Sequence, residues 1–275
     1  MYLGYNTNGL AHHGLLDAIE LLADIGYGGV AITIDHHALN PRDPGCRAQL
    51  AAVREALRRH GLRCVIETGA RFLLDPRCKH EPTLVSPEPE RRRRRLEFLQ
   101  HSVSVAEELE SDCVSLFAGV VRDDCSREEA LERLRGGLLE ILELADRRGV
   151  TLAFEPEPGM LVDTMDSFDA LLARLDGRPL KLTLDVGHLH CLGEAPPAEV
   201  ICKYRDLLVN VHLEDTRAGV HEHLMFGEGE MDFPPIFAAL KEIGYEGGVF
   251  VELSRHSHMA PEAARRSIEL LEPML

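Results

Sequence analysis

The second half of this chain repeats one pattern, in which a short, largely apolar run ends at an acidic or imidazole side chain. Four such runs cover residues 151–154, 180–184, 207–211 and 248–251, and they lead to Glu155, Asp185, His212 and Glu252, respectively. A run of this length between turn residues is typical of a strand that is buried on both faces of a parallel sheet. In α/β proteins, side chains just beyond the C-terminal ends of such strands carry the chemistry. The pattern therefore predicts a parallel sheet with a polar site along one edge.

Predicted strands and helices alternate along the whole chain. The strands are expected at 1–5, 30–34, 64–66, 114–117, 151–155, 180–185, 207–211 and 248–252. The helices are expected at about 15–25, 45–60, 88–110, 126–148, 166–175, 198–205, 234–243 and 260–272. No change of composition marks a second domain, and 275 residues suit one barrel of roughly 250 residues. We therefore predict an α/β fold, a single (β/α)8 TIM barrel, as one domain over residues 1–275.

Charge and composition narrow the classes of partner. The formal net charge is −16, which argues against a nucleic-acid partner because such binding relies on Lys and Arg side chains that neutralise phosphates. The first basic residue is Arg42, and no apolar run approaches the roughly 20 residues of a membrane span, so neither a secretory signal nor a membrane partner is expected. The seven cysteines are scattered and lack a Cys-x-x-Cys pair, which suits a reducing cytoplasm. We expect a cytoplasmic protein with a small-molecule ligand; a homo-oligomer is left open.

Two basic segments precede the repeated pattern. Five consecutive arginines, residues 91–95, open a predicted helix, and they should splay around it as a solvated helix start and not line one nucleic-acid-binding face. The long, Pro-bearing loop 68–88 is predicted to be a functional lid, because loops of this length in compact domains tend to be functional. Its Arg71 and His80, together with Arg217 after the seventh strand, are candidates to hold substrate hydroxyls or a carboxylate. Solvated loop charges are the alternative interpretation for all three.

The four residues at the strand ends form a candidate metal site. A barrel brings its strand ends together around one axis, so Glu155, Asp185, His212 and Glu252 should become neighbours. Three carboxylates and one imidazole favour Mn²⁺, Mg²⁺, Co²⁺ or Zn²⁺ over copper or an iron–sulfur cluster. Without a cation, carboxylates packed this closely would raise one another's pKa. The alternative is that each residue merely caps its own strand.

Three histidines lie just beyond the sixth and seventh strands. His188 follows Asp185 by three positions, and His221 and His223 lie on the next loop. They are candidates for a second metal ion. They could equally hydrogen-bond substrate hydroxyls or support the first site from outside. The loop that follows, 227–232, is acidic and would repel a phosphate, so an unphosphorylated substrate is expected.

At these residues the chain resembles the xylose isomerase-like TIM barrels, a broad group of sugar isomerases and epimerases that also contains endonuclease IV. Glu155, Asp185, His212 and Glu252 match the metal quartet of ketose 3-epimerases such as D-tagatose 3-epimerase. In that family the two glutamates also exchange the substrate proton, and a histidine at the position of His188 contacts substrate.

The resemblance to endonuclease IV is more distant. His221 and His223 fall where that enzyme keeps an Asp-x-His pair for its third zinc, with His188 completing the set. The third and fourth strands, however, end at Glu67 and Gly119, where the endonuclease supplies two further zinc-binding histidines. DNA repair is therefore not expected.

The resemblance implies a divalent-metal-dependent isomerase or epimerase that acts on an unphosphorylated sugar, ketose or cyclitol. The expected chemistry is proton transfer through a metal-stabilised enediolate, with Glu155 and Glu252 as the catalytic acid and base. Two alternatives stay open. One is a metal-dependent dehydratase of an inosose- or dehydroshikimate-like substrate, and the other is a non-catalytic barrel for sugar binding or metabolite traffic.

Overall fold

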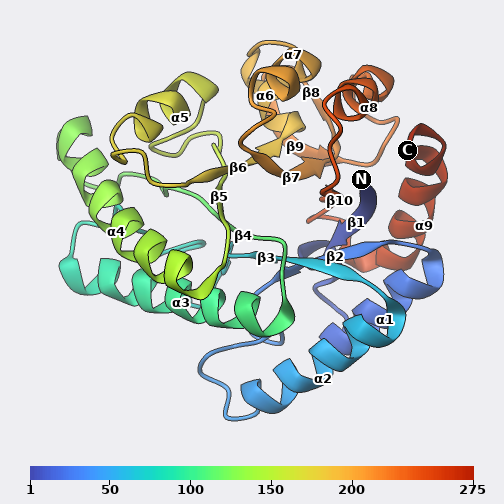
Figure 1. Cartoon of the computed structure of the whole chain (residues 1–275), viewed down its shortest axis with the longest axis horizontal. Helices are drawn as coiled ribbons and strands as arrows, with labels where there is room; N and C mark the ends of the chain where they lie inside the picture. The colour runs from blue at the N-terminus through green and yellow to red at the C-terminus, as the bar shows by residue number, and fades with distance from the viewer.

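A computed structural model describes all 275 residues, and its parallel strands close into a barrel (Figure 1). The order around the barrel is β1-β10-β7-β6-β5-β4-β3-β2, and β1 pairs with both β2 and β10 to complete it. The barrel strands are β1 (Tyr2–Asn6), β2 (Gly29–Thr33), β3 (Arg63–Glu67), β4 (Val114–Leu116), β5 (Leu152–Phe154), β6 (Lys181–Asp185), β7 (Leu208–Leu213) and β10 (Gly248–Val251). The predicted single (β/α)8 TIM barrel is confirmed.

Helices surround the barrel as an outer layer (Figure 1). They are α1 (Leu15–Ile25), α2 (Cys46–His60), α3 (Pro89–Leu109), α4 (Arg127–Arg148), α5 (Met165–Leu172), α6 (Val186–Leu192), α7 (Pro197–Lys203), α8 (Phe233–Glu242) and α9 (Ala260–Leu271). Short 3-10 helices cover Thr7–Leu10, Ser257–Met259 and Glu272–Met274. Local sequence explains several ends: Ser126 accepts a hydrogen bond from the Glu129 N–H at the start of α4, and Gly149 ends the same helix in the left-handed conformation.

Two elements beyond the sixth and seventh strands were not predicted from the sequence. The helix α6 begins directly after Asp185, whose side chain caps it. An antiparallel hairpin of β8 (Asp215–Arg217) and β9 (Val220–Leu224) replaces the expected loop, with Gly219 at a φ of 74° in its turn. The Gly219 N–H donates to the Cys191 carbonyl at 3.0 Å, which ties the hairpin to α6. The elements are too short to show a clear apolar period, since α6 has seven residues and the two strands have three and five.

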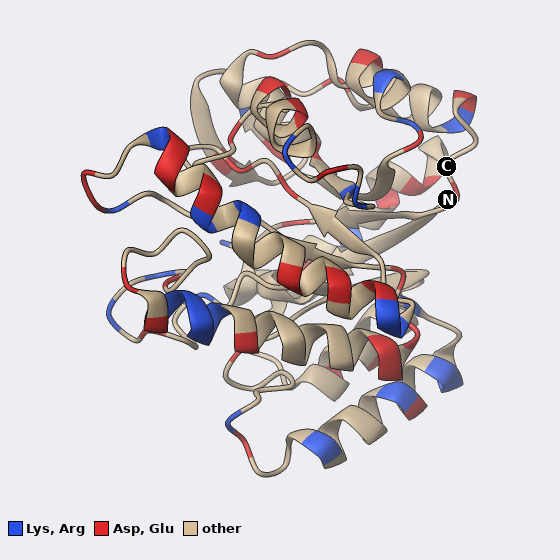
Figure 2. Ribbon diagram, turned by 60° about the vertical axis from the view of Figure 1, so that its left-hand side comes forward, with Lys and Arg blue, Asp and Glu red and all other residues tan.

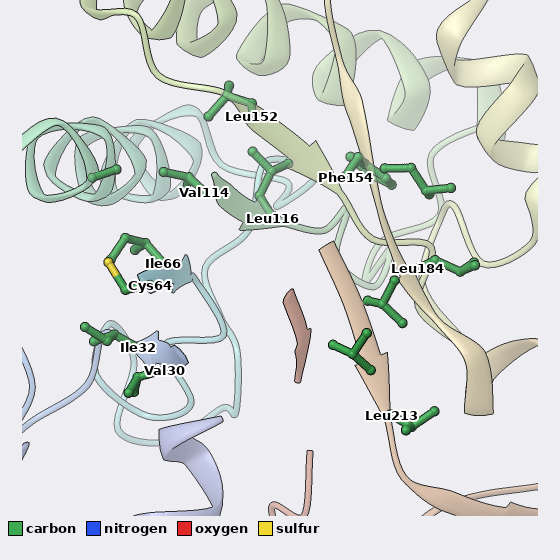
Figure 3. Close-up of a cluster of buried hydrophobic side chains, with 14 of the residues drawn as sticks. Val30, Ile32, Cys64, Ile66, Val114, Leu116, Leu152, Phe154, Leu184 and Leu213 are labelled. Atoms are coloured by element: carbon green, nitrogen blue, oxygen red, sulfur yellow. The ribbon is translucent and has the colours of Figure 1, made fainter. Parts of the chain in front are cut away.

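Side chains alternate between the two faces of each barrel strand. The outward set, including Val30, Ile66 and Leu184, joins the large core between the strands and the helices (Figure 3). The inward set at the bottom of the barrel is a separate small cluster of Ala31, Val65, Cys113, Ala153 and Phe250. The Phe250 ring fills this space so completely that a Cβ at Gly4 or Gly248 would lie 2.2 Å from it. The absence of a side chain at these glycines leaves room for the Phe250 ring, which fills the bottom of the barrel.

The arginine run departs from its predicted solvated state at its last residue. Arg95 is only 1% exposed; it donates from Nη2 to the Thr68 carbonyl at 2.8 Å. Its guanidinium lies over the rings of Phe98 and Phe117, at 5.3 and 5.0 Å from their centroids. The prediction of a solvated helix start is therefore wrong for Arg95. The run does splay around the helix, because Arg93 and Arg94 are exposed.

The loop 68–88 is packed against the barrel and is not a free flap. Its Leu73 and Leu84 are buried in the main core. Its Glu81, 2% exposed, accepts hydrogen bonds from Arg122 at 2.8 Å and from Arg91 at 3.3 Å. The loop thus forms a fixed rim over one side of the barrel, held by arginines of neighbouring segments.

Acidic and basic residues are interspersed along the helices in the ribbon of Figure 2. None of the helices combines the length and the apolar character that crossing a bilayer requires.

Two glycine substitutions should change stability in opposite directions. Gly248→Ala places a methyl group against the Phe250 ring and should destabilise the protein by about 1–3 kcal/mol. Gly136→Ala, in the interior of α4 with no atom within 4 Å of the added Cβ, should stabilise it by about 0.5–1 kcal/mol. Urea unfolding of the two variants measures both effects. Equal free energies of unfolding for the two variants would contradict the tight packing of Phe250 against Gly248.

Candidate metal centre and active site

The alternation of side chains places all four predicted ligands in the barrel interior. Asp185 ends β6, His212 lies in β7, and Glu155 and Glu252 follow β5 and β10. Asp185 and His212 are direct partners in the strand register. One potential ligand atom from each of the four residues lies within 4.8 Å of the others. The structure therefore brings together the quartet that the sequence predicted.

The imidazole of His212 is the centre of this group. Its Nδ1 lies 3.0 Å from Oε1 of Glu155 and 3.0 Å from Oε2 of Glu252. Its Nε2 lies 2.9 Å from Oε1 of Glu67, which also accepts a hydrogen bond from Nδ2 of Asn210 at 3.1 Å. A carboxylate on the second ring nitrogen is the common support of a metal-ligating histidine. Glu67 therefore orients His212 so that Nδ1 faces the other carboxylates.

Asp185 and Glu252 are each fixed through one oxygen. Oδ1 of Asp185 accepts from the backbone N–H groups of Gly187 and His188 at 2.8 and 3.1 Å. Its Oδ2 is buried and has no hydrogen-bond partner. Oε1 of Glu252 accepts from Nδ2 of Asn8 at 2.6 Å. A buried carboxylate oxygen without a partner is costly, and an ion bound among these oxygen-rich ligands would satisfy it, so the residues fit a hard divalent cation.

Burial and charge shift the pKa values of the cluster in opposite directions. Burial raises the pKa of Glu155 to about 8, against the opposing effect of His212. For His212, burial alone would lower the pKa, but the carboxylates of Glu67, Glu155 and Glu252 outweigh it and raise the pKa well above its usual value. Burial also opposes ionisation of Glu252, yet the neighbouring His212 lowers the pKa of that carboxyl. Without a cation, these shifts favour a protonated His212, an ionised Glu252 and a neutral Glu155.

The three predicted histidines form a second group beside the quartet. The ring centroids of His188 and His221 lie 4.8 Å apart, and those of His221 and His223 lie 5.3 Å apart. His188 and His223 each place Nδ1 at 3.1 Å from a backbone carbonyl, of Pro156 and Glu252 respectively. The Nε2 of His188 is buried and forms no hydrogen bond, and it lies 3.4 Å from Oδ2 of Asp185. Burial lowers the pKa of His188, and lowers that of His221 to about 4, so both favour the neutral form that binds metals or accepts hydrogen bonds.

A cavity of about 250 Å³ opens above the quartet. Phe117 and Met160 are its only hydrophobic lining residues, whereas ordinary ligand pockets are lined mainly by apolar side chains. The lining instead suits a strongly hydroxylated ligand. Arg71 and His80, which the sequence proposed as substrate-binding residues, line the cavity. Arg217 does not: it lies in β8, half exposed, and donates to the Glu228 carbonyl at 2.7 Å because the hairpin carries it away from the barrel axis.

Several residues of the site were not predicted from the sequence. Asn8 and Glu157 line the cavity, and Glu67 supports His212. Glu214 is 1% exposed and its Oε2 lacks a partner; burial and the charge of Asp185 raise its pKa well above the usual value. The available signal for Glu67 was its position at a strand end, in the same pattern as the quartet.

Comparisons with known proteins agree with this architecture. The model of the xylose isomerase-like TIM barrel family matches residues 19–274. The L-ribulose-5-phosphate 3-epimerase UlaE of Shigella flexneri is 27% identical over 251 residues, 90% of this chain and 85% of the relative. The inosose dehydratase of Clostridium beijerinckii is 33% identical over 150 residues, 48% of this chain, and the chain spans about half (50%) of the length of that relative.

Solved structures show the same fold at low sequence identity. A D-tagatose 3-epimerase-like protein superposes with a TM-score of 0.76 at 23% identity, over 99% of each chain. The IOLI protein with a bound zinc atom superposes with a TM-score of 0.76 at 20% identity, over 100% of this chain and 99% of that one. The resemblance noted from the sequence is confirmed.

The quartet should bind one divalent cation. After reconstitution with Mn²⁺, metal analysis of the purified protein is expected to find one ion per chain at this site. Asp185→Asn and His212→Ala should lose it, because each removes a ligand of a four-residue set. Arg217→Gln, outside the cavity, is the matched control. Absence of metal after reconstitution with Mn²⁺, Co²⁺ and Zn²⁺ would refute the site.

Cation affinity should rise with pH through the neutral range. Since the pKa of His212 is raised, its proton must leave before a cation binds, and the apparent affinity should rise up to about tenfold per pH unit. Glu67→Gln removes a carboxylate that raises this pKa and should move the rise to lower pH. Titration calorimetry with Mn²⁺ measures both. A pH-independent affinity in the wild-type protein would be inconsistent with the described cluster.

Proposed function

The chain belongs to the xylose isomerase-like TIM barrel family, and we propose that it acts as a divalent-metal-dependent isomerase or epimerase of an unphosphorylated sugar, ketose or cyclitol. The observation that carries the proposal is the pair Glu155 and Glu252, which follow β5 and β10 and both lie 3.0 Å from the same nitrogen of His212. Two carboxyl groups at one position, at the floor of a hydrophilic cavity, suit proton removal and return at a single carbon.

The environments of the two glutamates divide the roles of acid and base. Glu252, whose pKa is lowered and which Asn8 holds by a hydrogen bond, suits the base that removes a proton next to a carbonyl. Glu155, whose burial raises its pKa to about 8, suits the acid that returns one. Carboxyl pairs whose environments separate their pKa values commonly divide acid and base roles in this way.

A cation is required because carboxylates alone do not make a carbon-bound proton acidic enough. Glu155, Asp185, His212 and Glu252 would hold it, and the chemistry it supplies when bound is polarisation of a carbonyl and a neighbouring hydroxyl. Mn²⁺, Co²⁺, Mg²⁺ and Zn²⁺ all suit this donor set, and zinc is the ion in the similar IOLI structure. His188, His221 and His223 would hold a second ion or contact substrate hydroxyls directly.

A dehydratase is the second candidate, and one observation favours it. Glu157 lines the cavity beside the reacting pair, with Oε2 at 3.9 Å from Nε2 of His188, and burial raises its pKa well above the usual value. A neutral carboxylic acid at this place would protonate a hydroxyl that leaves as water. An inosose dehydratase is also among the relatives. A product lighter by one water distinguishes this reaction from an isomerisation, and binding without turnover would indicate a sugar-binding barrel.

Deuterium exchange tests the proton transfer. In D₂O, the Mn²⁺-loaded protein should place deuterium on one carbon of its substrate from a panel of ketoses, inososes and keto-acid sugars. Glu252→Gln removes the base and should slow exchange by about 10²–10⁴-fold. Glu228→Gln, which does not line the cavity, should leave the rate unchanged. Conversion of substrate without label would overturn the proton-transfer mechanism and leave the metal site standing.

A further inference from the structure

One wall of the cavity is basic, whereas its floor is acidic. Arg71, Lys79 and His80 come from the rim loop and line the same cavity as Glu155 and Glu252. Lys79 is exposed, and the side chain of Arg71 is 27% exposed, while the glutamates of the floor are buried further in. A ligand that spans the cavity therefore meets carboxylates at one end and cationic groups at the other.

The basic groups are held in place with their binding atoms free. Nε and Nη2 of Arg71 both contact Oδ2 of Asp35, at 2.6 and 2.5 Å, and Nη1 has no partner within the protein. Nδ1 of His80 donates to the Gly69 carbonyl at 2.7 Å, which leaves Nε2 as the free ring nitrogen. Lys79 forms no ion pair, in a chain with 46 acidic and 30 basic residues. The charge of Lys79 is therefore available to a ligand in the cavity.

The backbone of this wall is strained where these side chains leave it. Ala70, Arg71 and His80 have positive φ angles of 54°, 25° and 67°. Non-glycine residues in such conformations are energetically costly and persist where the surroundings impose them, often at ligand-binding sites. Here the His80 ring packs against Phe117 at 5.7 Å between centroids, and the buried Arg95 holds Thr68 from behind. The fold thus maintains a costly conformation that presents Arg71 and His80 to the cavity.

We infer that Arg71, Lys79 and His80 form a subsite for a carboxylate at the end of the substrate remote from the reacting carbon. This inference rests on the proposed function and makes the substrate a sugar acid. The charge balance selects a singly charged group: Asp35 already compensates Arg71, burial lowers the pKa of His80 to about 4 and keeps it neutral, and Lys79 remains as one net positive charge. A phosphate dianion would exceed this charge.

Binding of three matched five-carbon ligands tests the subsite. Titration calorimetry of the Mn²⁺-loaded full chain would compare xylitol, xylonate and xylitol 5-phosphate. Xylonate should bind at least tenfold more tightly than xylitol. Lys79→Gln should remove most of that preference without changing the affinity for xylitol, and Arg71→Lys should also weaken xylonate selectively. Arg77→Gln, on the same loop but outside the cavity lining, is the control.

The outcomes separate this inference from the proposed function. Equal binding of xylitol and xylonate, or equal losses for both ligands in Lys79→Gln, would overturn the subsite, while deuterium exchange into a neutral ketose would still support the isomerase. Tighter binding of xylitol 5-phosphate than of xylonate would overturn the assignment to a singly charged group. Failure of all three ligands to bind, together with no exchange into any sugar, would refute both proposals.

Discussion

The imidazole of His212 lies among the carboxylates of Glu67, Glu155 and Glu252 inside the barrel, and the upper half of the barrel depends on the balance of charge in this group. Buried ions are costly unless they are paired and hydrogen-bonded. Asn8 and Asn210 donate to two of the carboxylates, and backbone N–H groups donate to Asp185. A divalent cation would neutralise the remaining negative charge, so this arrangement, which is costly without an ion, is the candidate metal site.

The strands build this site by the same alternation that builds the core. Residues two apart on one strand face the barrel interior, so Phe250 at the bottom implies Glu252 at the top, and Ala153 implies Glu155. Between the apolar cluster around Phe250 and the carboxylates above it, Asn210 donates a hydrogen bond to Thr183, which donates one to Ser115. An apolar plug, a hydrogen-bonded polar layer and a layer of ligands thus follow one another along the barrel axis. This order keeps the charged layer at the end of the barrel that opens to solvent.

The rim loop lines one side of the cavity with basic side chains. Arginines of α3 and neighbouring segments hold it through buried Glu81 and through backbone carbonyls, and this support sustains the strained conformation of Arg71 and His80. Some of the arginines in and near α3 therefore have a structural role. Arg95 illustrates the point, since its guanidinium packs between two aromatic rings and never reaches solvent.

The sequence by itself determined the barrel and the four residues of the candidate metal site, because strand length, apolar character and the residue that ends each strand are local properties. Only the tertiary structure decided which residues contact this quartet. Glu67 meets His212 across 145 positions only because the barrel closes with a particular register, and no local pattern encodes that meeting. The burial of Arg95 and the exclusion of Arg217 from the cavity likewise depend on packing against distant segments. A strand end shows which residues can reach a site, whereas closure of the sheet decides which of them do.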